Sequence, residues 1–271
     1  MKLIVTADDY GITDAVTDGI CKCARLGVLT QTGLFTNMPG SEYAAKRMIN
    51  EYPHICLGQD INLVAGNPVT DPKLIPTLVQ EDGSFRTSSM HRKLDQTQPN
   101  HIKYEEAYLE TENQVKRFID LTGKKPAYLS GHSYGTVETE RAIKDVAQKY
   151  EVVLSMDMYK KIGVAAGLET AEWNKVVVKS DGKYDFGMDV QFSRDPLKLF
   201  KEGKLDYLEK ALKENGVAHI HTHAGFADKD LFDLSSFTLI RIMEANFITS
   251  KELVDWVKVN NVELVSINDL K

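Results

Sequence analysis

Cysteine is scarce in this chain. The 271 residues include three cysteines, which form neither a CxxC pair nor an even set. They are Cys21, Cys23 and Cys56. Structural disulfides and thiolate zinc sites are therefore not expected, and a reducing compartment is the simplest assumption.

Long apolar runs and an excess of positive charge are also missing. No stretch approaches the roughly 18 apolar residues of a membrane span, and the apolar run at residues 3–5 is too short for the core of a signal peptide. Lysine and arginine total 33 against 39 aspartates and glutamates, a net charge of −6. This balance argues against binding to nucleic acid or anionic lipid. We predict a cytoplasmic protein that acts on small molecules, with no nucleic acid or membrane partner.

What the chain does contain is the composition of a packed domain, with 42% apolar and 27% charged residues. Short β-branched apolar runs alternate with longer segments of helical period, which is typical of βα units around a parallel sheet. The predicted strands are Leu3–Thr6, Leu29–Thr36, Ile55–Leu63, Ala127–Ser130, Val152–Met156, Lys175–Lys179, Val217–Thr222 and Val262–Ile267. The predicted helices are Asp14–Leu26, Glu42–Glu51, Glu105–Leu121, Glu138–Lys149, Lys204–Asn215, Ser235–Ala245 and Lys251–Asn260. We predict one α/β domain over residues 1–271.

The segment from Val64 to Asn100 interrupts this alternation. It carries four prolines and shows no sustained period, so we interpret it as a long insertion. A loop of this length in a compact domain is usually functional or mobile, and we predict a lid over the site. A second irregular region, Tyr159–Ser193, contains one strand-like run and is interpreted as another surface excursion.

Two adjacent carboxylates, Asp8 and Asp9, directly follow the first predicted strand. The carboxyl ends of strands are where α/β active sites are built. Neighbouring acids repel, and a cation that neutralises one of them favours the arrangement. The alternative is that one of them caps the next helix, but Thr13 and Asp14 can cap that helix themselves. The pair is a candidate cation site.

Asp60 and Asn62 lie two residues apart at the end of the third predicted strand, so both face one side of it. A carboxylate in a run this apolar needs a partner, which a metal or a buried hydrogen-bond donor would supply. A polar strand end that faces water is the alternative, and the residues alone leave both open.

The segment from Gly131 to Gly135 allows two incompatible interpretations. It matches G-x-S-x-G, the nucleophile elbow of α/β-hydrolases, with Ser133 as the nucleophile. Alternatively, His132 is the functional residue, as a neutral imidazole ligand of a divalent metal. The match to G-x-S-x-G is weak by itself, because glycine and serine are common in such turns.

Three histidines, His219, His221 and His223, share one face of a predicted strand. Side chains at i and i+4 on a straight strand lie about 13 Å apart, so the three cannot share one ion. His223 is nearest the carboxyl end of the strand and is the candidate for the site. We expect the other two to be buried or structural.

Taken together, these four segments resemble the YdjC-like carbohydrate deacetylases, the family of the chitooligosaccharide deacetylases. The stretch from Leu3 to Gly11 is similar to that family's ADDFG start, with tyrosine in place of phenylalanine. Residues 29–32, 37–39 and 253–270 are also similar, so the resemblance runs nearly end to end. It implies a distorted or incomplete TIM-like β/α barrel, with which the predicted strands are compatible.

Carried over by position, the resemblance implies Asp8 as general base and Asp9, Asp60 and His132 as metal ligands. Asp60 stands where the family has a histidine, and the motif around His132 lacks the family's first aspartate and second histidine. The family's closing H-P-G keeps its histidine here as His223, which is implied to be the general acid.

The chemistry that the resemblance implies is metal-dependent removal of acetyl groups from N-acetylated oligosaccharides. A divalent ion would polarise the acetamide carbonyl and acidify a bound water. Asp8 would take the proton of the water, and a charged His223 would protonate the departing sugar amine. Two carboxylates and one imidazole are harder ligands than two imidazoles and one carboxylate, so Mg²⁺ is expected, with Zn²⁺ or Mn²⁺ as alternatives. Homodimers are common among such barrels, so a homodimer is expected.

Two other functions stay open. A serine hydrolase would use Ser133, an acid such as Asp189 or Asp206, and His223, but it leaves the acidic pair after the first strand unexplained and lacks an HGGG-like oxyanion segment. A catalytically weak sugar-binding or regulatory barrel would have kept the scaffold after losing ligands. Chelator sensitivity separates the metal hydrolase from the serine hydrolase, and turnover of acetylated sugars separates it from the binding protein.

Overall fold

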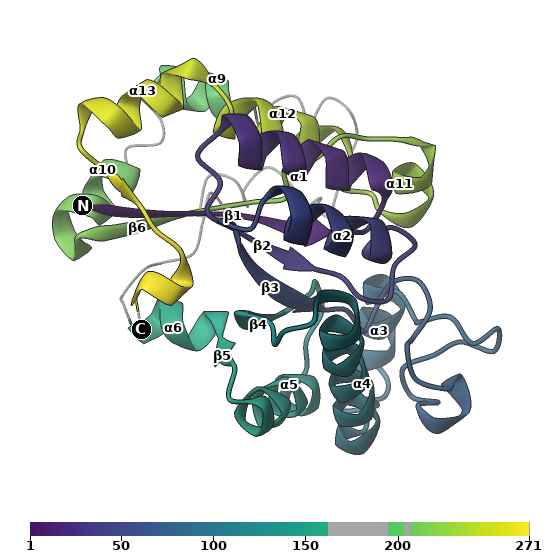
Figure 1. Cartoon of the computed structure of the whole chain (residues 1–271). Helices are drawn as coiled ribbons and strands as arrows, with labels where there is room; N and C mark the ends of the chain where they lie inside the picture. The colour runs from purple at the N-terminus through teal and green to yellow at the C-terminus, as the bar shows by residue number, and fades with distance from the viewer. Residues whose placement is uncertain (162–194, 204–206, 271) are drawn as a thin grey trace.

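A computed structural model describes residues 1–161, 195–203 and 207–270, which form a parallel sheet covered by helices (Figure 1). The strands are β1 (Lys2–Tyr10), β2 (Gln31–Leu34), β3 (Cys56–Ile61), β4 (Tyr128–Gly131), β5 (Val153–Leu154), β6 (Val217–Thr222) and β7 (Glu263–Leu264). Their order is β5-β4-β3-β2-β1-β6, and β7 pairs in parallel with the start of β1. Within the described residues β5 and β6 end this order unpaired with each other, so the barrel is not closed. The predicted α/β class and incomplete barrel are confirmed.

Seven of the eight predicted strands coincide with an observed one, and the eighth, Lys175–Lys179, lies outside the described residues. The long helices also lie where the sequence predicts them. They are α1 (Asp14–Leu26), α2 (Ser41–Glu51), α4 (Tyr104–Thr122), α5 (Val137–Tyr150), α10 (Tyr207–Asn215), α12 (Leu239–Ile248) and α13 (Lys251–Val259). Thr13 caps α1, because its side chain accepts a hydrogen bond from the Val16 amide at 3.2 Å. None of the helices in the described part of the chain is long and apolar enough to cross a membrane.

Shorter helices lie where no period is visible in the sequence. They are α3 (Ser88–Asp95), α6 (Ser155–Lys161), α9 (Pro196–Lys201) and α11 (Lys229–Leu234), with 3₁₀ turns η1 (Pro72–Leu74) and η2 (Ile267–Leu270). Eight residues or fewer span about two turns of helix, too few for a 3.6-residue period to show.

The sheet is buried on both faces. On the outer face, Leu3 and Val5 of β1 belong to the main apolar core beneath α1 and α12 (Figure 1). On the inner face, Ile4 packs with Tyr128 of β4 and Ile267 near the carboxyl terminus. Alternate residues of β1 therefore serve two different cores, as expected for a central parallel strand.

The insertion at 64–100 is more ordered than its sequence suggests. It contributes Ile75, Leu78 and Phe85 to an apolar cluster against α4 and α5, and Val79 and Phe85 form an antiparallel bridge. The absence of a sustained period in the sequence is consistent with this structure, because α3 and this bridge are too short to give a periodic signal. A role as a lid stays a prediction.

Candidate active site

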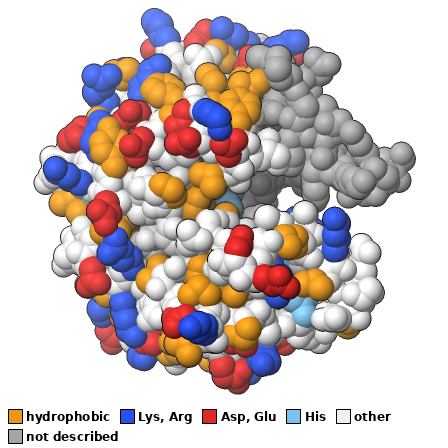
Figure 2. Space-filling model, turned by 90° about the vertical axis from the view of Figure 1, so that its right-hand side faces the viewer, with side chains coloured by type: hydrophobic (Ala, Val, Ile, Leu, Met, Phe, Trp, Pro, Cys, Tyr) orange, Lys and Arg blue, Asp and Glu red, His pale blue; other side chains and the backbone are white. Residues whose placement is uncertain are grey.

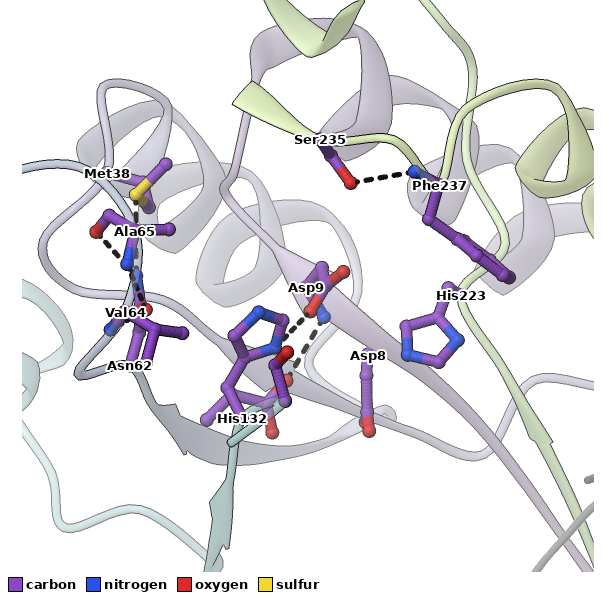
Figure 3. A network of polar contacts seen from close by, with 12 residues as sticks. Asp8, Asp9, Met38, Asn62, Val64, Ala65, His132, His223, Ser235 and Phe237 are labelled. Carbon is purple, nitrogen blue, oxygen red and sulfur yellow. Dashed lines mark hydrogen bonds and ion pairs between the residues drawn. The ribbon is translucent and has the colours of Figure 1, made fainter. Parts of the chain in front are cut away.

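A bulge in β1 sends Asp8 and Asp9 in different directions. The β1–β2 register shifts between Ala7 and Tyr10, and Asp9 has a φ of 66°, in the left-handed region. A bulge re-aims the side chains that follow it, and such strain persists only where the surroundings fix it. Asp8 consequently faces β6, while Asp9 faces β3 and β4 (Figure 3).

Asp9 is buried between Arg241 and His132. Its side chain is 2% exposed, and Oδ2 lies 2.5 Å from Nη2 of Arg241, on α12. Oδ1 lies 3.0 Å from Nδ1 of His132, which follows β4. Burial alone would raise the pKa of Asp9, but the charges of His132 and Arg241 outweigh burial and hold that pKa well below its usual value. Asp9 is therefore ionised in the folded protein.

Asp60 meets Asp9 from β3. Its Oδ2 accepts a hydrogen bond from the Asp9 amide at 3.0 Å, and among the described residues its buried Oδ1 has no hydrogen-bond partner. Burial, followed by the charges of Asp8 and Asp9, raises the pKa of Asp60 well above its usual value. A Cβ on Gly33 would lie 2.1 Å from Oδ1 of Asp60, so the glycine makes the room for this carboxyl group.

A cation beside Asp9 and His132 would give the buried Oδ1 of Asp60 a partner, although among the described residues the ligand atoms of these three side chains do not all lie within 4.8 Å of one another. A cation there would offset the burial and the repulsion by Asp8 and Asp9 that together raise the pKa of Asp60, and would allow that group to ionise. The sequence places all three residues correctly at strand ends, on β1, β3 and immediately after β4. Their role as ligands stays a prediction.

Asp8 forms a second cluster, with histidines of β6. Its Oδ2 lies 2.6 Å from Nε2 of His221. Within the described residues, the group of three acidic or histidine side chains whose ligand atoms all lie within 4.8 Å is Asp8, His221 and His223. Burial would raise the pKa of Asp8, but the charge and hydrogen bond of His221 lower it below its usual value.

His223 is fixed through its backbone. Its amide donates to Oε2 of Glu244 at 2.7 Å, and its carbonyl accepts from Nη1 of Arg241 at 3.4 Å. Burial lowers the pKa of His223 to about 4. This lowered pKa differs from the expectation of a charged His223 in the resting site, because partial burial of the ring disfavours the imidazolium.

The other two histidines of β6 differ from each other. His219 is 3% exposed, lies 2.8 Å from the Thr6 hydroxyl and stacks on Tyr159 at 4.4 Å between ring centroids, so its predicted burial is confirmed. His221 is a site residue that the sequence analysis missed. The pairing of β1 with β6 places Thr6 opposite His221 and so brings His221 close to Asp8. No local sequence motif indicates such a pairing.

Asn62 and Ser133, which the sequence also singles out, follow the ends of β3 and β4. Asn62 anchors a loop, because its Oδ1 accepts from the amides of Val64 at 3.1 Å and Ala65 at 3.0 Å (Figure 3). Ser133 has a φ of 62°, as a nucleophile elbow would, but its hydroxyl lies 2.8 Å from that of Ser88. In the described part of the chain no hydrogen bond joins Ser133 to a histidine.

The remaining elements of the serine hydrolase alternative cannot be placed, since Asp189 and Asp206 lie outside the described residues. Ser133 itself is held by the insertion, because its carbonyl accepts from Nη2 of Arg92 at 3.4 Å.

A cavity of about 410 Å³ opens beside His132, between β4, α5 and α6. Leu129 and Ile143 give it an apolar wall, and Glu140 and Lys160 add charge. Figure 2 looks onto the carboxyl-terminal edge of the sheet, where a histidine lies in a depression near the middle of the face. The volume lies within the roughly 300–1,000 Å³ of small-molecule sites.

Comparison with known proteins gives matches over nearly the whole chain. The family described as YdjC-like protein matches residues 2–259. Carbohydrate deacetylase 2 of Listeria innocua serovar 6a is 32% identical over 277 residues, covering 100% of this chain and 99% of the relative. A carbohydrate deacetylase of Thermoanaerobacter pseudethanolicus is 29% identical over 273 residues, covering 99% of each.

Among solved structures, a protein from Enterococcus faecalis V583 named for cellobiose-phosphate cleavage superposes with a TM-score of 0.73. It is 23% identical, and the match covers 99% of this chain and 98% of the other. This likeness shows the fold.

Proposed function

The chain belongs to the YdjC-like family, and from this we propose that it is a hydrolase that removes acetyl groups from N-acetylated carbohydrates. The observation that carries the proposal is the convergence of polar side chains from the ends of β1, β3, β4 and β6. The names of its relatives, which span the same length, support the choice of substrate class.

A divalent cation would be held by Asp9, Asp60 and His132, and when bound it would polarise the acetamide carbonyl and activate water. Arg241 engages Oδ2 of Asp9 and leaves Oδ1 directed toward His132. The two carboxylates favour Mg²⁺, with Zn²⁺ or Mn²⁺ as alternatives.

Asp8 is the proposed general base. It is the ionised carboxylate on the open side of the bulge, with a side chain that is 15% exposed. His221 orients this carboxylate through the 2.6 Å contact. A base must reach the proton that it abstracts, and a partly exposed carboxylate at a strand end can do so.

His223 is the proposed general acid. A neutral imidazole can protonate the departing amine only after it has taken up a proton. Its ligand nitrogen and the Asp8 carboxylate belong to a group within 4.8 Å, so the proton that Asp8 removes from water has a short route to the leaving group. The acid and the base thereby act as one pair.

Release of acetate from N-acetylchitooligosaccharides tests the proposed function. With Mg²⁺ or Mn²⁺ supplied separately, the protein should release acetate, and a chelator should stop it. Asp8→Asn should lower the rate by roughly 10²–10⁴, the contribution typical of a general base. Ser133→Ala should retain most of the activity.

Two results would contradict this function. If Ser133→Ala abolishes turnover that a chelator leaves intact, the protein is a serine hydrolase. If oligosaccharides bind but no metal supports acetate release, it is a sugar-binding member of the family. The expected homodimer is tested separately by sedimentation velocity.

A further inference from the structure

The cluster of Asp8, His221 and His223 has the composition of a metal site of its own. One carboxylate and two imidazoles are a ligand set that zinc uses in open sites with three protein ligands. These three ligand atoms lie within 4.8 Å of one another. Asp8 lies on β1, His221 on β6 and His223 directly after β6, and the parallel pairing of these two strands holds the three residues side by side.

The geometry needs little adjustment to accept an ion. Ligands at about 2.0–2.2 Å from a tetrahedral zinc lie about 3.4 Å apart. The Asp8 and His221 atoms, now 2.6 Å apart, would open by less than about 1 Å. The His221 and His223 rings are 5.2 Å apart between centroids and tilted by 46°, so they do not stack face to face.

Solvent can reach this cluster. The side chains of Asp8 and His221 are 15% and 20% exposed, in contrast to 2% for Asp9. An ion bound here would therefore keep a coordination position for water. Asp9 points away from this cluster, toward β3 and β4, because the bulge in β1 directs the two consecutive aspartates to different strands.

We propose that Asp8, His221 and His223 bind a second divalent ion of the zinc type, and that an ion held there inhibits the enzyme by occupying its base and its acid. The proposed inhibition (the inhibitory half) rests on the proposed function, whereas the proposed binding of zinc (the binding half) does not. Imidazole ligands favour zinc over magnesium, so zinc should inhibit at concentrations where magnesium supports turnover.

Zinc binding by the metal-free full chain tests the site directly. Equilibrium dialysis against Zn²⁺ in excess Mg²⁺ gives the affinity and the number of ions bound. His221→Asn should weaken one zinc site by more than the about 10–100-fold that loss of an outer-shell partner costs. His223→Asn should give the same loss, and a circular dichroism spectrum identifies any variant that does not fold.

The matched controls are His101→Gln and His132→Asn. His101 belongs to another histidine pair, 2.7 Å from Nδ1 of His91, and His132 belongs to the proposed magnesium set. Both variants should keep the zinc ion. Unchanged zinc binding in folded His221→Asn and His223→Asn, or loss of that ion in either control, would overturn the site.

Inhibition is measured on acetate release at fixed Mg²⁺ with increasing Zn²⁺. Wild type should be inhibited, and in His221→Asn the inhibition curve should shift to at least about tenfold higher zinc. Zinc binding without inhibition of an active enzyme would overturn the inhibitory half alone. Absence of acetate release under all conditions would reject the proposed function, while the dialysis result would still decide the site.

Discussion

Arg241 is the largest fully buried side chain in the described part of the chain. Its guanidinium neutralises Asp9, and its Nε donates to the Phe237 carbonyl at 2.7 Å. The pair has no sequence signal, because its members are 232 positions apart in the sequence. This cation from α12 acts together with His132 to compensate for the burial of Asp9.

Replacing Arg241 with methionine should leave an unpaired charge in the interior. We expect the free energy of unfolding to fall by about 3–5 kcal/mol, measured by urea denaturation. Lys229→Ala, which breaks an exposed ion pair with Asp233, should change it by less than about 1 kcal/mol. The double variant Asp9→Asn, Arg241→Met should lose less than the sum of the single losses, and additive losses would show that the two side chains do not interact.

Gly33 controls the position of Asp60. In Gly33→Ala the new Cβ would collide with the Asp60 carboxyl group, and displacement by about 1 Å can cost 10²-fold in rate. We expect acetate release to fall by at least about tenfold while the variant still folds. Gly135→Ala is the control, because its nearest atom would lie 3.5 Å away. Equal activity of the two variants would argue against any role for Asp60.

The loop that carries His132 ends where α5 begins. A capping box at its amino end joins Thr136 and Thr139, whose side chains each accept a hydrogen bond from the other's amide, at 3.2 Å and 2.7 Å. Thr136→Ala should lower the free energy of unfolding by about 1 kcal/mol in urea denaturation. Thr136→Ser retains the hydroxyl and should lose little, and equal losses in both variants would mean that the cap is not what stabilises the helix.

The α3 helix is tied to the same loop through His91. The His91 ring stacks on Tyr134 at 5.1 Å between centroids, and its Nδ1 lies 2.7 Å from Nε2 of His101. Burial, followed by the charges of His101 and Arg86, lowers the pKa of His91 to about 4. The folded protein therefore resists protonation at this position.

This lowered pKa makes stability depend on pH. Between pH 6.5 and about 4 the unfolded chain binds a proton at His91 that the folded chain does not, so the free energy of unfolding falls as pH falls through this range. We expect His91→Gln to remove on the order of 1–3 kcal/mol of that fall, measured by urea denaturation at several pH values. A pH profile identical to wild type would show that another group is responsible.

For the molecule as a whole, the sequence predicts the helices and strands that have a local apolar period. It does not predict the contacts between residues that are distant in the chain. The long helices and the strands around Asp8, Asp60 and His223 have clear apolar patterns, so their ends could be placed. The parallel arrangement then brings their polar ends to one edge. The contact of His221 with Asp8 depends on the register of β1 with β6. The contact of Arg241 with Asp9 depends on the packing of α12. Neither contact can be read from a local sequence pattern.

The insertion at 64–100 contains short elements that the sequence does not reveal. Its prolines correctly indicate an interruption of the βα pattern, but η1, α3 and a single antiparallel bridge are too short to be read from it. The pKa of His223 was also beyond sequence reasoning, because it depends on burial by segments that are distant in the chain.

The central place of β1 has a consequence for biosynthesis. β1 leaves the ribosome before β6, with which it pairs along one edge, and 206 residues, 11–216, separate the two strands. At about 5–20 residues per second, translation of that interval takes roughly 10–40 s. During this time the nascent β1 has one edge without its final partner, and an unpaired strand edge is a template for association with other chains. The protein is therefore exposed to misassembly for most of its translation, and chaperones that bind the emerging chain would act on this edge.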